Sequence, residues 1–510
     1  MSQICIIIVM VLYLALMLYV GFAANKKGSG KSTDEFYLGN RKIGPLVTAM
    51  SAEASDMSSY LLMGLPGLAY LTGICDVGWT VIGLAAGTYL NWLLVSKRLR
   101  RYSEKLNAIT IPDFFSKRYH DEKSILSCIA AVVILTFFIP YTASGFKAIG
   151  TLFNSLFGID YHTAMIVGGL VVVLYTVIGG FVAVSTTDLL QSVVMTFALI
   201  VTVIFGIRYA GGWDNVVSNA QSLSGYLSMN ATYNVADGSS SHYGFITICS
   251  TLAWGLGYFG MPHILLRFMA IRDEKELTLS RRIASIWVVI SMSVAILIGI
   301  VGNAVSKAGL IPYLNTSSES ETVIIELSNI LSQKGVFFAL IAGLVMAGIL
   351  ACTMSTADSQ LLQASSSFSQ NILQDFFRIK MDQKKSMLFA RGTVAAIAVI
   401  GVILAWNPDS SVFTIVSFAW AGFGAAFGPL MLCSLFWKRT TKSGALAGMI
   451  AGGVTVFVWK FLVRPLGGAW NIYELLPAFI VSAIVIVVVS LLTAAPSEEI
   501  QKEFDAVNAK

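Results

Sequence analysis

Two acidic residues lie in the middle of an apolar stretch, residues 44–73, that is long enough to cross a lipid bilayer. Glu53 and Asp56 stand there among serines and alanines, and the helix-breaking run GLPG follows at 64–67. A carboxylate at the centre of a bilayer costs about 2.5–3.5 kcal/mol, so it normally faces a partner, a cavity or a transport pathway. Transporters often break a helix at this depth, where the freed carbonyls hold a cation. We therefore predict a broken crossing, interrupted in its second half by 64–67.

A second polar run lies within the apolar stretch 335–366, where Cys352, Ser355, Thr356 and Asp358 occur close together. A hard monovalent cation prefers oxygen ligands, which hydroxyls and main-chain carbonyls supply without excess charge. Serine and threonine in membrane helices also hydrogen-bond neighbouring helices, so packing is the alternative interpretation. Packing is the more common role, but the density of hydroxyls beside another intramembrane acid strengthens the case for an ion site, and both interpretations stay open. We expect this crossing to be interrupted like the first.

A third polar run places Asp188 directly after the hydroxyl residues 185–187, near the predicted inner end of an apolar stretch. Ser/Thr-x-x-Asp is an ordinary sequence for the start of a helix, where such side chains accept bonds from free N–H groups. An acid at membrane depth is equally typical of an ion pathway. The residues alone leave both roles open.

Aromatic residues and helix breakers are mixed in 253–263, where Trp254, Tyr258 and Pro262 stand among glycines. Aromatic residues in a crossing usually pack in the interior or lie at the membrane interface. Next to broken backbone, however, their apolar faces and polar tips suit a small-molecule pocket. The pattern therefore favours a ligand pocket over an interfacial belt.

The composition indicates an all-α polytopic membrane protein. Of 510 residues, 56% are hydrophobic and 12% are charged, whereas soluble domains carry about 25% charged residues; the mean hydropathy is +0.75. The six cysteines are scattered singly and support neither a disulfide framework nor a zinc site. We recognise no pairing of a nucleophile with a base in a cleft, so we expect no enzyme.

Thirteen apolar runs are long enough to be membrane crossings. They lie at residues 5–24, 44–73, 77–96, 124–155, 162–182, 186–209, 242–266, 283–306, 335–366, 389–406, 412–437, 443–463 and 474–493. Alternate loops hold 28 of the 34 lysines and arginines, and the opposite loops hold four. By the positive-inside rule, the N-terminus is therefore outside and the C-terminus inside.

This distribution of charge explains the net charge of +6 without a nucleic-acid partner. We expect one transmembrane transporter domain, 1–493, followed by a short cytoplasmic tail, 494–510. The apolar N-terminus lacks a basic region and a clean cleavage site before its positive flank, so we interpret it as a retained crossing and not as a signal peptide.

Four stretches, in this order along the chain, resemble the sodium/solute symporter family and most closely its bacterial sodium/proline symporters. They are SAEASDMSSYLLMGLPG, GGFVAVSTTDLLQS, LAWGLGYFGMPHILLRFMA and MSTADSQLLQASS. The resemblance implies two inverted five-helix repeats, crossings 2–6 and 7–11, with one crossing before them and two after. It also implies import of L-proline with Na⁺ by alternating access in the bacterial inner membrane. The expected partners are a small-molecule substrate and the lipid bilayer, with no nucleic acid and no obligate protein partner.

The same resemblance implies roles for individual residues. The sodium ligands would be the carbonyl oxygens of Ala54, Met57 and Cys352 and the hydroxyls of Ser355 and Thr356. The residues that match substrate-binding positions are Ser58, Tyr141, Trp254, Tyr258 and Pro262. The residues that match positions for coupling or the ion pathway are Asp56, Asp188 and Arg41.

Four residues depart from the pattern that the resemblance leads us to expect: Glu53, Met261, Asp358 and Lys147. Additional charges within crossings can pair with each other, change the substrate or admit protons, so the roles of Glu53 and Asp358 stay open. The alternative function in the same class is a Na⁺-coupled symporter for another small amino acid or a carboxylate. A solute sensor or a channel are further alternatives, and we expect no cytoplasmic catalytic domain of the kind that a sensor needs.

Overall fold

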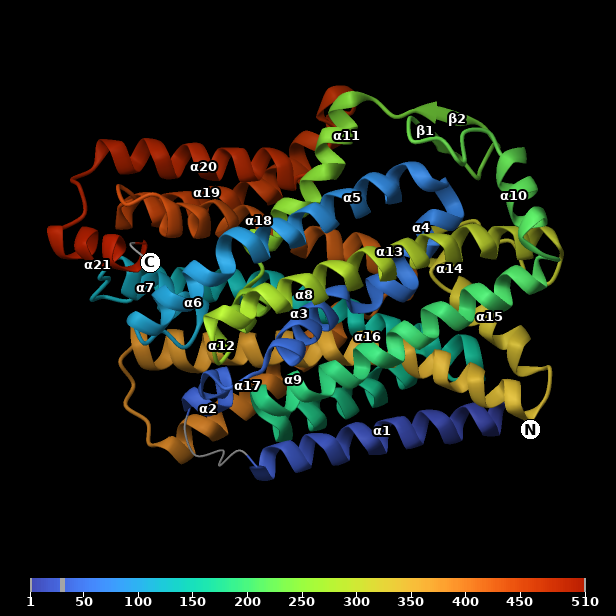
Figure 1. The fold of residues 1–510 in the computed structure, drawn as a ribbon, viewed down its shortest axis with the longest axis horizontal. Coiled ribbons are helices and arrows are strands. Elements are labelled where there is room, and N and C mark those ends of the chain that lie inside the picture. The colour runs from blue at the N-terminus through green and yellow to red at the C-terminus, as the bar shows by residue number, and fades with distance from the viewer. Residues whose placement is uncertain (1, 28–32, 509–510) are drawn as a thin grey trace.

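The computed structural model describes residues 2–27 and 33–508, and in these the protein is almost entirely helical (Figure 1). Ten helices of the described residues are long and apolar enough to cross a membrane. They lie at Ser2–Ala23, Ile74–Lys105, Ile125–Phe157, Gly180–Tyr209, Glu274–Lys307, Val336–Phe376, Lys384–Leu404, Val412–Phe436, Lys442–Leu466 and Leu475–Leu492. Shorter apolar helices lie at Tyr161–Leu174, Phe245–Phe259 and Val323–Ser332. The predicted all-helical, multi-pass class is confirmed, because a helix is the form in which an apolar run bonds all its own backbone within lipid.

The first half of the chain supplies the following elements: α1 (Ser2–Lys27), α2 (Thr33–Leu38), α3 (Pro45–Ser59), α4 (Leu65–Thr72), α5 (Ile74–Leu90), α6 (Ser96–Lys105), α7 (Ile111–Arg118), α8 (Ile125–Phe157), α9 (Tyr161–Tyr209), α10 (Trp213–Ser222), β1 (Ala231–Tyr233) and β2 (Ser240–His242). The second half supplies α11 (Phe245–Leu252), α12 (Pro262–Ala270), α13 (Leu277–Lys307), α14 (Ser317–Ser320), α15 (Val323–Ser332), α16 (Val336–Ser366), α17 (Gln383–Leu404), α18 (Val412–Phe436), α19 (Lys442–Val458), α20 (Leu475–Leu492) and α21 (Glu498–Asn508). The two strands pair antiparallel, with Ala231 opposite His242.

The crossing α3–α4 is broken, but at a different place from the one predicted. Ser58 has φ 48° and ψ −170°, and the π-helical turn Tyr60–Gly64 follows it. Pro66 lies in the first turn of α4, where proline needs no N–H partner, so the GLPG run does not make the break. Gly67 has a packing role instead, because a Cβ there would come within 2.8 Å of the backbone nitrogen of Glu321.

The crossing α11–α12 is broken as predicted. A 3₁₀ segment, Ala253–Phe259, separates the two α-helices, and Pro262 opens α12. The glycines here allow close approach: a Cβ on Gly255 would lie 2.1 Å from the carbonyl oxygen of Gly83, and one on Gly257 would lie 1.9 Å from Trp420 Nε1. The break therefore lets α5 and α18 pack directly on the exposed backbone.

Two other crossings differ from the prediction. Helix α9 continues through the predicted boundary between crossings 5 and 6, and its break lies at Gly180, with φ 63° and ψ −179°. Helix α16 runs without a break from Val336 to Ser366, so the prediction that it is interrupted is wrong. The polar residues of α16 interrupt its apolar pattern, but they occur at helical spacing and do not form a turn sequence. The backbone therefore stays helical.

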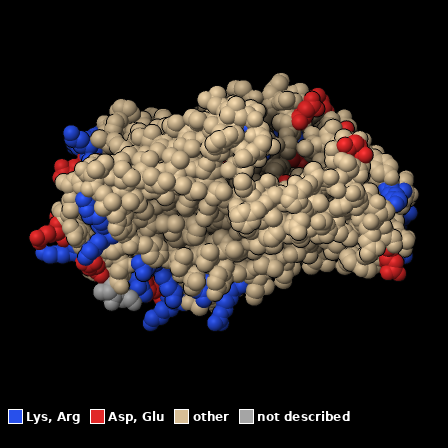
Figure 2. Space-filling view, turned by 90° about the horizontal axis from the view of Figure 1, so that it is seen from above, with Lys and Arg blue, Asp and Glu red and all other residues tan. Residues whose placement is uncertain are grey.

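Helix α16 lies at the centre of the molecule, packed against α1, α3, α8 and α9. The ends marked N and C lie at opposite ends of the long axis, with α10, α14 and α15 near the N end and α6, α7 and α21 near the C end (Figure 1). On the face shown in Figure 2, most of the middle carries no charged side chains, and lysines and arginines gather at the C end. This is the charge pattern of a protein with a membrane-embedded middle and one basic face.

Candidate ion and substrate site

The break at Ser58 turns backbone carbonyls of α3 toward neighbouring helices. The Ser355 hydroxyl of α16 donates to the carbonyl oxygen of Ala54 at 2.8 Å, and the Tyr141 hydroxyl of α8 donates to that of Asp56 at 3.2 Å. In a regular helix each backbone carbonyl accepts from the N–H group four residues on, so it needs no side-chain donor. The break is therefore what makes these oxygens available to side chains or to a cation. Because a positive φ on a non-glycine residue costs about 1–3 kcal/mol, this geometry has to be maintained by the surrounding packing.

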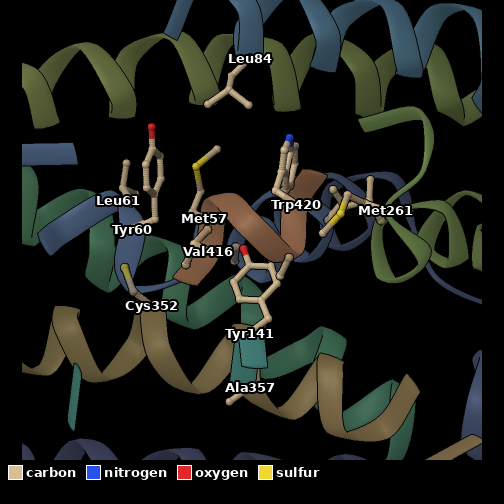
Figure 3. Packing of buried hydrophobic residues seen from close by; sticks show 14 of the residues in the cluster. Met57, Tyr60, Leu61, Leu84, Tyr141, Met261, Cys352, Ala357, Val416 and Trp420 are labelled. Atoms are coloured by element: carbon tan, nitrogen blue, oxygen red, sulfur yellow. The ribbon is translucent and has the colours of Figure 1, made fainter. Parts of the chain in front are cut away.

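The five predicted sodium ligands lie on α3 and α16, where these helices touch. Ser355 Oγ lies 2.8 Å from the Ala54 carbonyl oxygen and 3.2 Å from that of Cys352. Thr356 Oγ1 is buried and has no hydrogen-bond partner among the described residues. Met57 stands one turn from Ala54, and Figure 3 shows its side chain near those of Tyr60 and Cys352. A set of carbonyls and hydroxyls that includes an unpartnered buried oxygen suits a hard monovalent cation, which needs oxygen ligands with little charge.

Asp56 connects the first break to the second. Its Oδ2 accepts a hydrogen bond of 2.6 Å from the hydroxyl of Tyr258, in the 3₁₀ segment. Its Oδ1 is buried and has no partner in the part of the chain that is described. Asn91 fixes the same segment from the other side, donating to the carbonyl oxygen of Tyr258 at 3.0 Å. The carboxylate therefore bonds a predicted substrate residue, while Asp56 itself stands between the predicted sodium residues Ala54 and Met57 in the chain.

Aromatic side chains from several helices gather around Tyr258, the partner of Asp56, and Figure 3 shows three of them, Tyr60, Tyr141 and Trp420. Trp254 stacks on Tyr60, with ring centroids 5.9 Å apart, and on Tyr473 at 4.9 Å. Trp420 donates from Nε1 to the carbonyl oxygen of Trp254 at 2.8 Å and meets Tyr258 edge-to-face at 5.0 Å. These contacts fix rings that provide apolar surface and hydroxyl tips, which is the composition of a site for a small amphipathic molecule.

Asp188 belongs to a separate buried cluster. Its Oδ2 accepts from Ser51 Oγ at 2.6 Å and pairs with Arg267 Nη2 at 3.2 Å. Arg267 also donates to Ser359 Oγ at 2.6 Å, and Ser359 donates to Asp358 Oδ1 at 3.3 Å. Asp188 thus accepts bonds from other helices and not from a helix start, so the capping interpretation is wrong. Two acids and one arginine share the cluster.

Comparison with known proteins identifies the family. The model of the sodium:solute symporter family matches residues 36–452. The chain belongs to that family. It is 42% identical to the high-affinity proline transporter PutP of Bacillus subtilis over 96% of this chain and 98% of the relative. It is also 42% identical to the sodium/proline symporter of Escherichia coli, over 98% of this chain and 95% of the relative.

Solved structures agree on the fold. A Na⁺-coupled sialic acid symporter in a substrate-bound outward-open state superposes with a TM-score of 0.78 at 18% identity, covering 97% of this chain and 99% of the other. Mhp1, a nucleobase-cation-symport-1 family transporter, gives a TM-score of 0.57 at 14% identity, covering 92% and 98%. The prediction of a multi-pass membrane transporter that uses sodium and is not an enzyme is confirmed by the family.

The remaining predicted residues of this symporter lie beside the two helix breaks or at the basic end of the molecule. Pro262 is buried at the start of α12, directly after the 3₁₀ segment. Ser58 accepts from the backbone nitrogen of Tyr60 at 3.1 Å. Arg41 lies at the basic end, where it donates to the carbonyl oxygens of Met269 at 2.6 Å and Ala108 at 2.7 Å. Arg41 therefore connects the segment before α3 to the end of α12 and to the loop before α7.

The residues that depart from the expected pattern are buried and have partners. Glu53 Oε1 accepts from Trp92 Nε1 at 3.0 Å, while Lys147 pairs with Glu321 at 3.1 Å. Met261 is buried near Trp420 (Figure 3). The partners of Glu53 and Lys147 are far away in the sequence, so these pairings could not be derived from spacing, whereas Asp358 accepts from its neighbour Ser359.

Sequence reasoning missed several residues that the structure brings to the site. Arg267 is one of the 28 lysines and arginines counted above as loop residues, although a single arginine inside the apolar run HILLRFMA is itself a sign of an intramembrane partner. Tyr60, Trp420 and Tyr473 were missed because aromatic residues are common in membrane helices. Only the packing of α18 and the segment before α20 against the 3₁₀ segment distinguishes the last two.

Proposed function

We propose that this symporter imports L-proline together with Na⁺. The observation that carries the proposal is similarity at 42% identity, over nearly the whole of both chains, to transporters named for sodium and proline. The contact between the Ala54 carbonyl and the Ser355 hydroxyl supports it, because it joins a broken helix to a hydroxyl-rich one. Such a pair of helices offers a cation oxygen atoms from both sides.

The proposed architecture has thirteen crossings. Crossings 2–6 and 7–11 form two inverted repeats, each of which begins with a broken helix, α3–α4 or α11–α12. The N-terminus is outside and the C-terminus inside, an orientation that the basic end of the molecule and the opposite positions of the termini support. Residues 1–493 are the transport domain and 494–510 the cytoplasmic tail, in which α21 packs against α6.

Sodium is the driving ion in this proposal. It is held by the carbonyl oxygens of Ala54, Met57 and Cys352 and by the hydroxyls of Ser355 and Thr356. One Na⁺ entering across 100 mV releases about 2.3 kcal/mol, and a tenfold concentration gradient adds about 1.4 kcal/mol. The two together support accumulation of several hundredfold for one-to-one coupling. Asp188 and Arg41 lie along the inward side and take part in release and coupling.

The substrate occupies the space beside Asp56 and the aromatic side chains. Trp254 and Pro262 provide apolar contacts for the pyrrolidine ring, while Tyr258, Tyr141 and Ser58 provide polar ones. Asp56 connects the two sites, because it directly precedes the sodium residue Met57 in the chain and bonds the substrate residues Tyr258 and Tyr141. Sodium bound to neighbouring oxygens of α3 therefore orders the substrate residues, which gives coupling its physical basis.

A second candidate substrate class is another small amino acid or a carboxylate. Glu53 Oε2 and Asp56 Oδ1, one turn apart on α3, are both buried and unpartnered within the described residues. Together with hydroxyl groups they are enough for the three N–H donors of a primary ammonium, whereas proline carries two. This observation favours testing primary amino acids beside proline.

Uptake by purified protein in sealed vesicles tests the proposal. An inward Na⁺ gradient should drive proline above its equilibrium distribution, and a panel of unlabelled amino acids and carboxylates should identify competitors. Equal accumulation with a proton gradient and no sodium would contradict the choice of ion. If another unlabelled amino acid inhibits the saturable uptake much more strongly than proline does, that amino acid would replace proline as the proposed substrate, and the choice of sodium would stand.

A further inference from the structure

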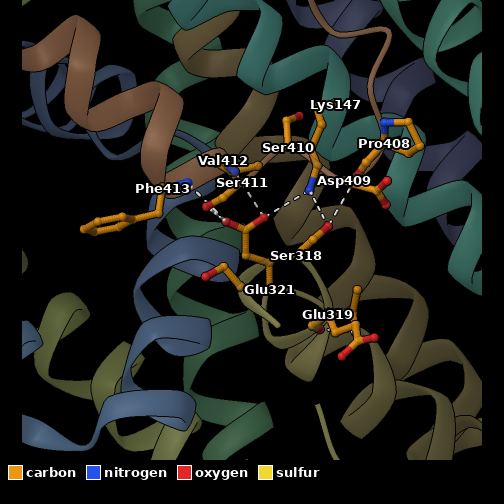
Figure 4. Close-up of polar contacts among 12 residues, drawn as sticks. Lys147, Ser318, Glu319, Glu321, Pro408, Asp409, Ser410, Ser411, Val412 and Phe413 are labelled. Atoms are coloured by element: carbon orange, nitrogen blue, oxygen red, sulfur yellow. Dashed lines mark hydrogen bonds and ion pairs between the residues drawn. The ribbon is translucent and has the colours of Figure 1, made fainter. Parts of the chain in front are cut away.

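Lys147 of α8 and Glu321, between α14 and α15, form a buried ion pair (Figure 4). Helices α14 and α15 lie near the end of the molecule marked N (Figure 1). Lys147 Nζ lies 3.1 Å from Glu321 Oε2 and donates to Ser318 Oγ at 3.3 Å. The two side chains of the pair are 0% and 2% exposed. Removing one member of such a pair is costly, because it leaves the other charge buried alone. The pair therefore holds α8 against the segment between α14 and α15 as long as it stays intact.

Glu321 also binds the beginning of α18. Its Oε1 accepts from the Ser411 hydroxyl at 2.8 Å and from the backbone nitrogen of Phe413 at 3.1 Å, and its Oε2 accepts from the backbone nitrogen of Val412 at 3.2 Å. A carboxylate is favoured at this place by the free N–H groups and by the positive end of the helix dipole. One side chain thus joins α8, the α14–α15 segment and α18.

The segment carrying Glu321 touches the broken crossing as well. The missing Cβ of Gly67 lets α4 approach to within 2.8 Å of the Glu321 nitrogen, measured from where that Cβ would be. On the other side, Ser318 donates to the carbonyl oxygen of Pro408, just before α18, at 3.3 Å. This segment, residues 317–322, therefore lies between α4, α8 and α18, and we call it the wedge.

Phe413 connects this wedge to the substrate region. Its backbone nitrogen is bonded by Glu321, and its ring lies 5.8 Å from that of Tyr60 and 5.6 Å from that of Trp254, centroid to centroid. Displacing Glu321 would therefore release the beginning of α18 and the ring that lies against the aromatic side chains. A movement that opens or closes the molecule at the beginning of α18 must therefore also move the ring that packs against the substrate residues.

We propose that Lys147 and Glu321 are the outer lock of the transport cycle, with Lys147 as a positioning residue that keeps the Glu321 carboxylate on the N-terminus of α18 when the outer side is closed. This rests on the proposed function, because it presumes alternation between outward-open and outward-closed states. Opening must break the ion pair and the three bonds to the start of α18 together, which makes the lock an all-or-none element. Substrate and sodium then enter past Phe413.

The closing experiment measures outward opening directly. Cys352 is buried in the described structure, so in a variant where the other five cysteines are serine, it should react with a membrane-impermeant thiol reagent from outside only when the lock opens. Lys147→Met should speed this labelling about tenfold, the factor that corresponds to about 1.4 kcal/mol. Lys147→Arg should return the rate toward that of the parent. The assay uses neither proline nor a sodium gradient, so its result does not depend on which solute is transported.

The Lys460→Met variant is the matched control. Lys460 also pairs with a buried acid, Glu474, but that acid keeps Arg464 at 3.0 Å as a second partner. Labelling in this variant should stay at the parental rate. In vesicles, Lys147→Met should lower the maximal uptake rate without raising the KM for proline, because more of the protein faces outward while closure is impaired. General damage to the fold would instead lower the amount of correctly inserted protein.

Two double variants complete the test. Lys147→Met/Glu321→Gln removes both charges, so it avoids a lone buried charge and should still label about tenfold faster than the parent. Labelling at the parental rate in this variant would overturn the lock. The exchange Lys147→Glu/Glu321→Lys should not restore slow labelling, because an ammonium cannot accept bonds from the N–H groups of α18. Full restoration by the exchange would overturn the part played by the start of α18.

Discussion

The two broken crossings, α3–α4 and α11–α12, are interrupted by different means and offer different chemistry. The first break is a single serine in a left-handed conformation, beside two acids, and it presents backbone oxygens to α16 and α8. The second is a seven-residue 3₁₀ segment with glycines and aromatic residues, and it presents rings and close-packed backbone to α5 and α18. The first is suited to a cation and the second to an organic substrate. Asp56, bonded to Tyr258, is the direct link between them.

The largest expected effect is loss of the oxygen ligands opposite the first break. Ser355→Ala/Thr356→Ala should raise the Na⁺ concentration needed for half-maximal uptake by well over tenfold, which corresponds to more than about 1.4 kcal/mol. The reason is that both hydroxyls of the proposed cation site are removed while the carbonyls remain. The measurement is uptake against Na⁺ concentration in vesicles. An unchanged sodium dependence would remove the Ser355 and Thr356 hydroxyls from the ion site.

Asp56→Asn tests the link between the two breaks. The amide can still accept from the Tyr258 hydroxyl, but the negative charge near the sodium residues is lost. We expect the sodium requirement to rise by more than tenfold, again more than about 1.4 kcal/mol, with a smaller change in KM for proline at saturating Na⁺. A change in KM alone would separate Asp56 from the ion and assign it to the substrate.

The second break should respond in the opposite sense. Trp254→Ala and Tyr258→Phe should each weaken proline affinity about tenfold or less while the sodium requirement changes less. Trp254→Ala removes apolar contact surface, and Tyr258→Phe removes a hydroxyl whose hydrogen bond contributes about 0.5–1.5 kcal/mol. Competition binding of proline and of Na⁺ to the purified protein measures the two separately. Equal losses in both variants would mean that the division of labour between the breaks is wrong.

Close packing at the second break predicts a stability effect. Gly257→Ala places a Cβ within 1.9 Å of Trp420 Nε1, so Trp420 has to move and its bond to the Trp254 carbonyl is disturbed. Overpacking of this kind costs about 1–3 kcal/mol. The Gly453→Ala variant is the control, because nothing lies within 4 Å of the Cβ that it adds. Thermal unfolding in detergent should distinguish the two, and equal midpoints would contradict the packing argument.

The smallest effect is expected at the first break itself. Glycine adopts a positive φ at no steric cost, so Ser58→Gly should relieve backbone strain, but it also removes the hydroxyl that accepts from the Tyr60 nitrogen. These contributions oppose each other and should leave the free energy of unfolding within about 1 kcal/mol of the parent. Ser58→Val is the informative contrast, because a β-branched residue at this φ is strongly disfavoured and should destabilise the protein clearly.

The sequence was sufficient for the class of protein, and it singled out most of the residues that we propose for the site. A long apolar run satisfies its backbone hydrogen bonds in lipid by forming a helix, and an acid within such a run normally faces a partner, a cavity or a pathway. That argument found Asp56, Asp188 and Asp358, and the mixture of glycines with aromatic residues found the second break. It placed the first break at the glycines and the proline, which was wrong, because Pro66 fits the start of α4 and Ser58 carries the turn.

Only the tertiary structure decided which of these residues meet. Lys147 and Glu321 are far apart in the chain, as are Arg267 and Asp188, and no periodicity within one helix reports on a contact between two. The same holds for the unbroken backbone of α16, whose hydroxyls interrupt the hydrophobic pattern without interrupting the helix. Local sequence determines which polar side chains and free backbone groups a helix carries into the lipid. The packing of α3, α8, α16 and α18 against each other determines which of these groups come within bonding distance.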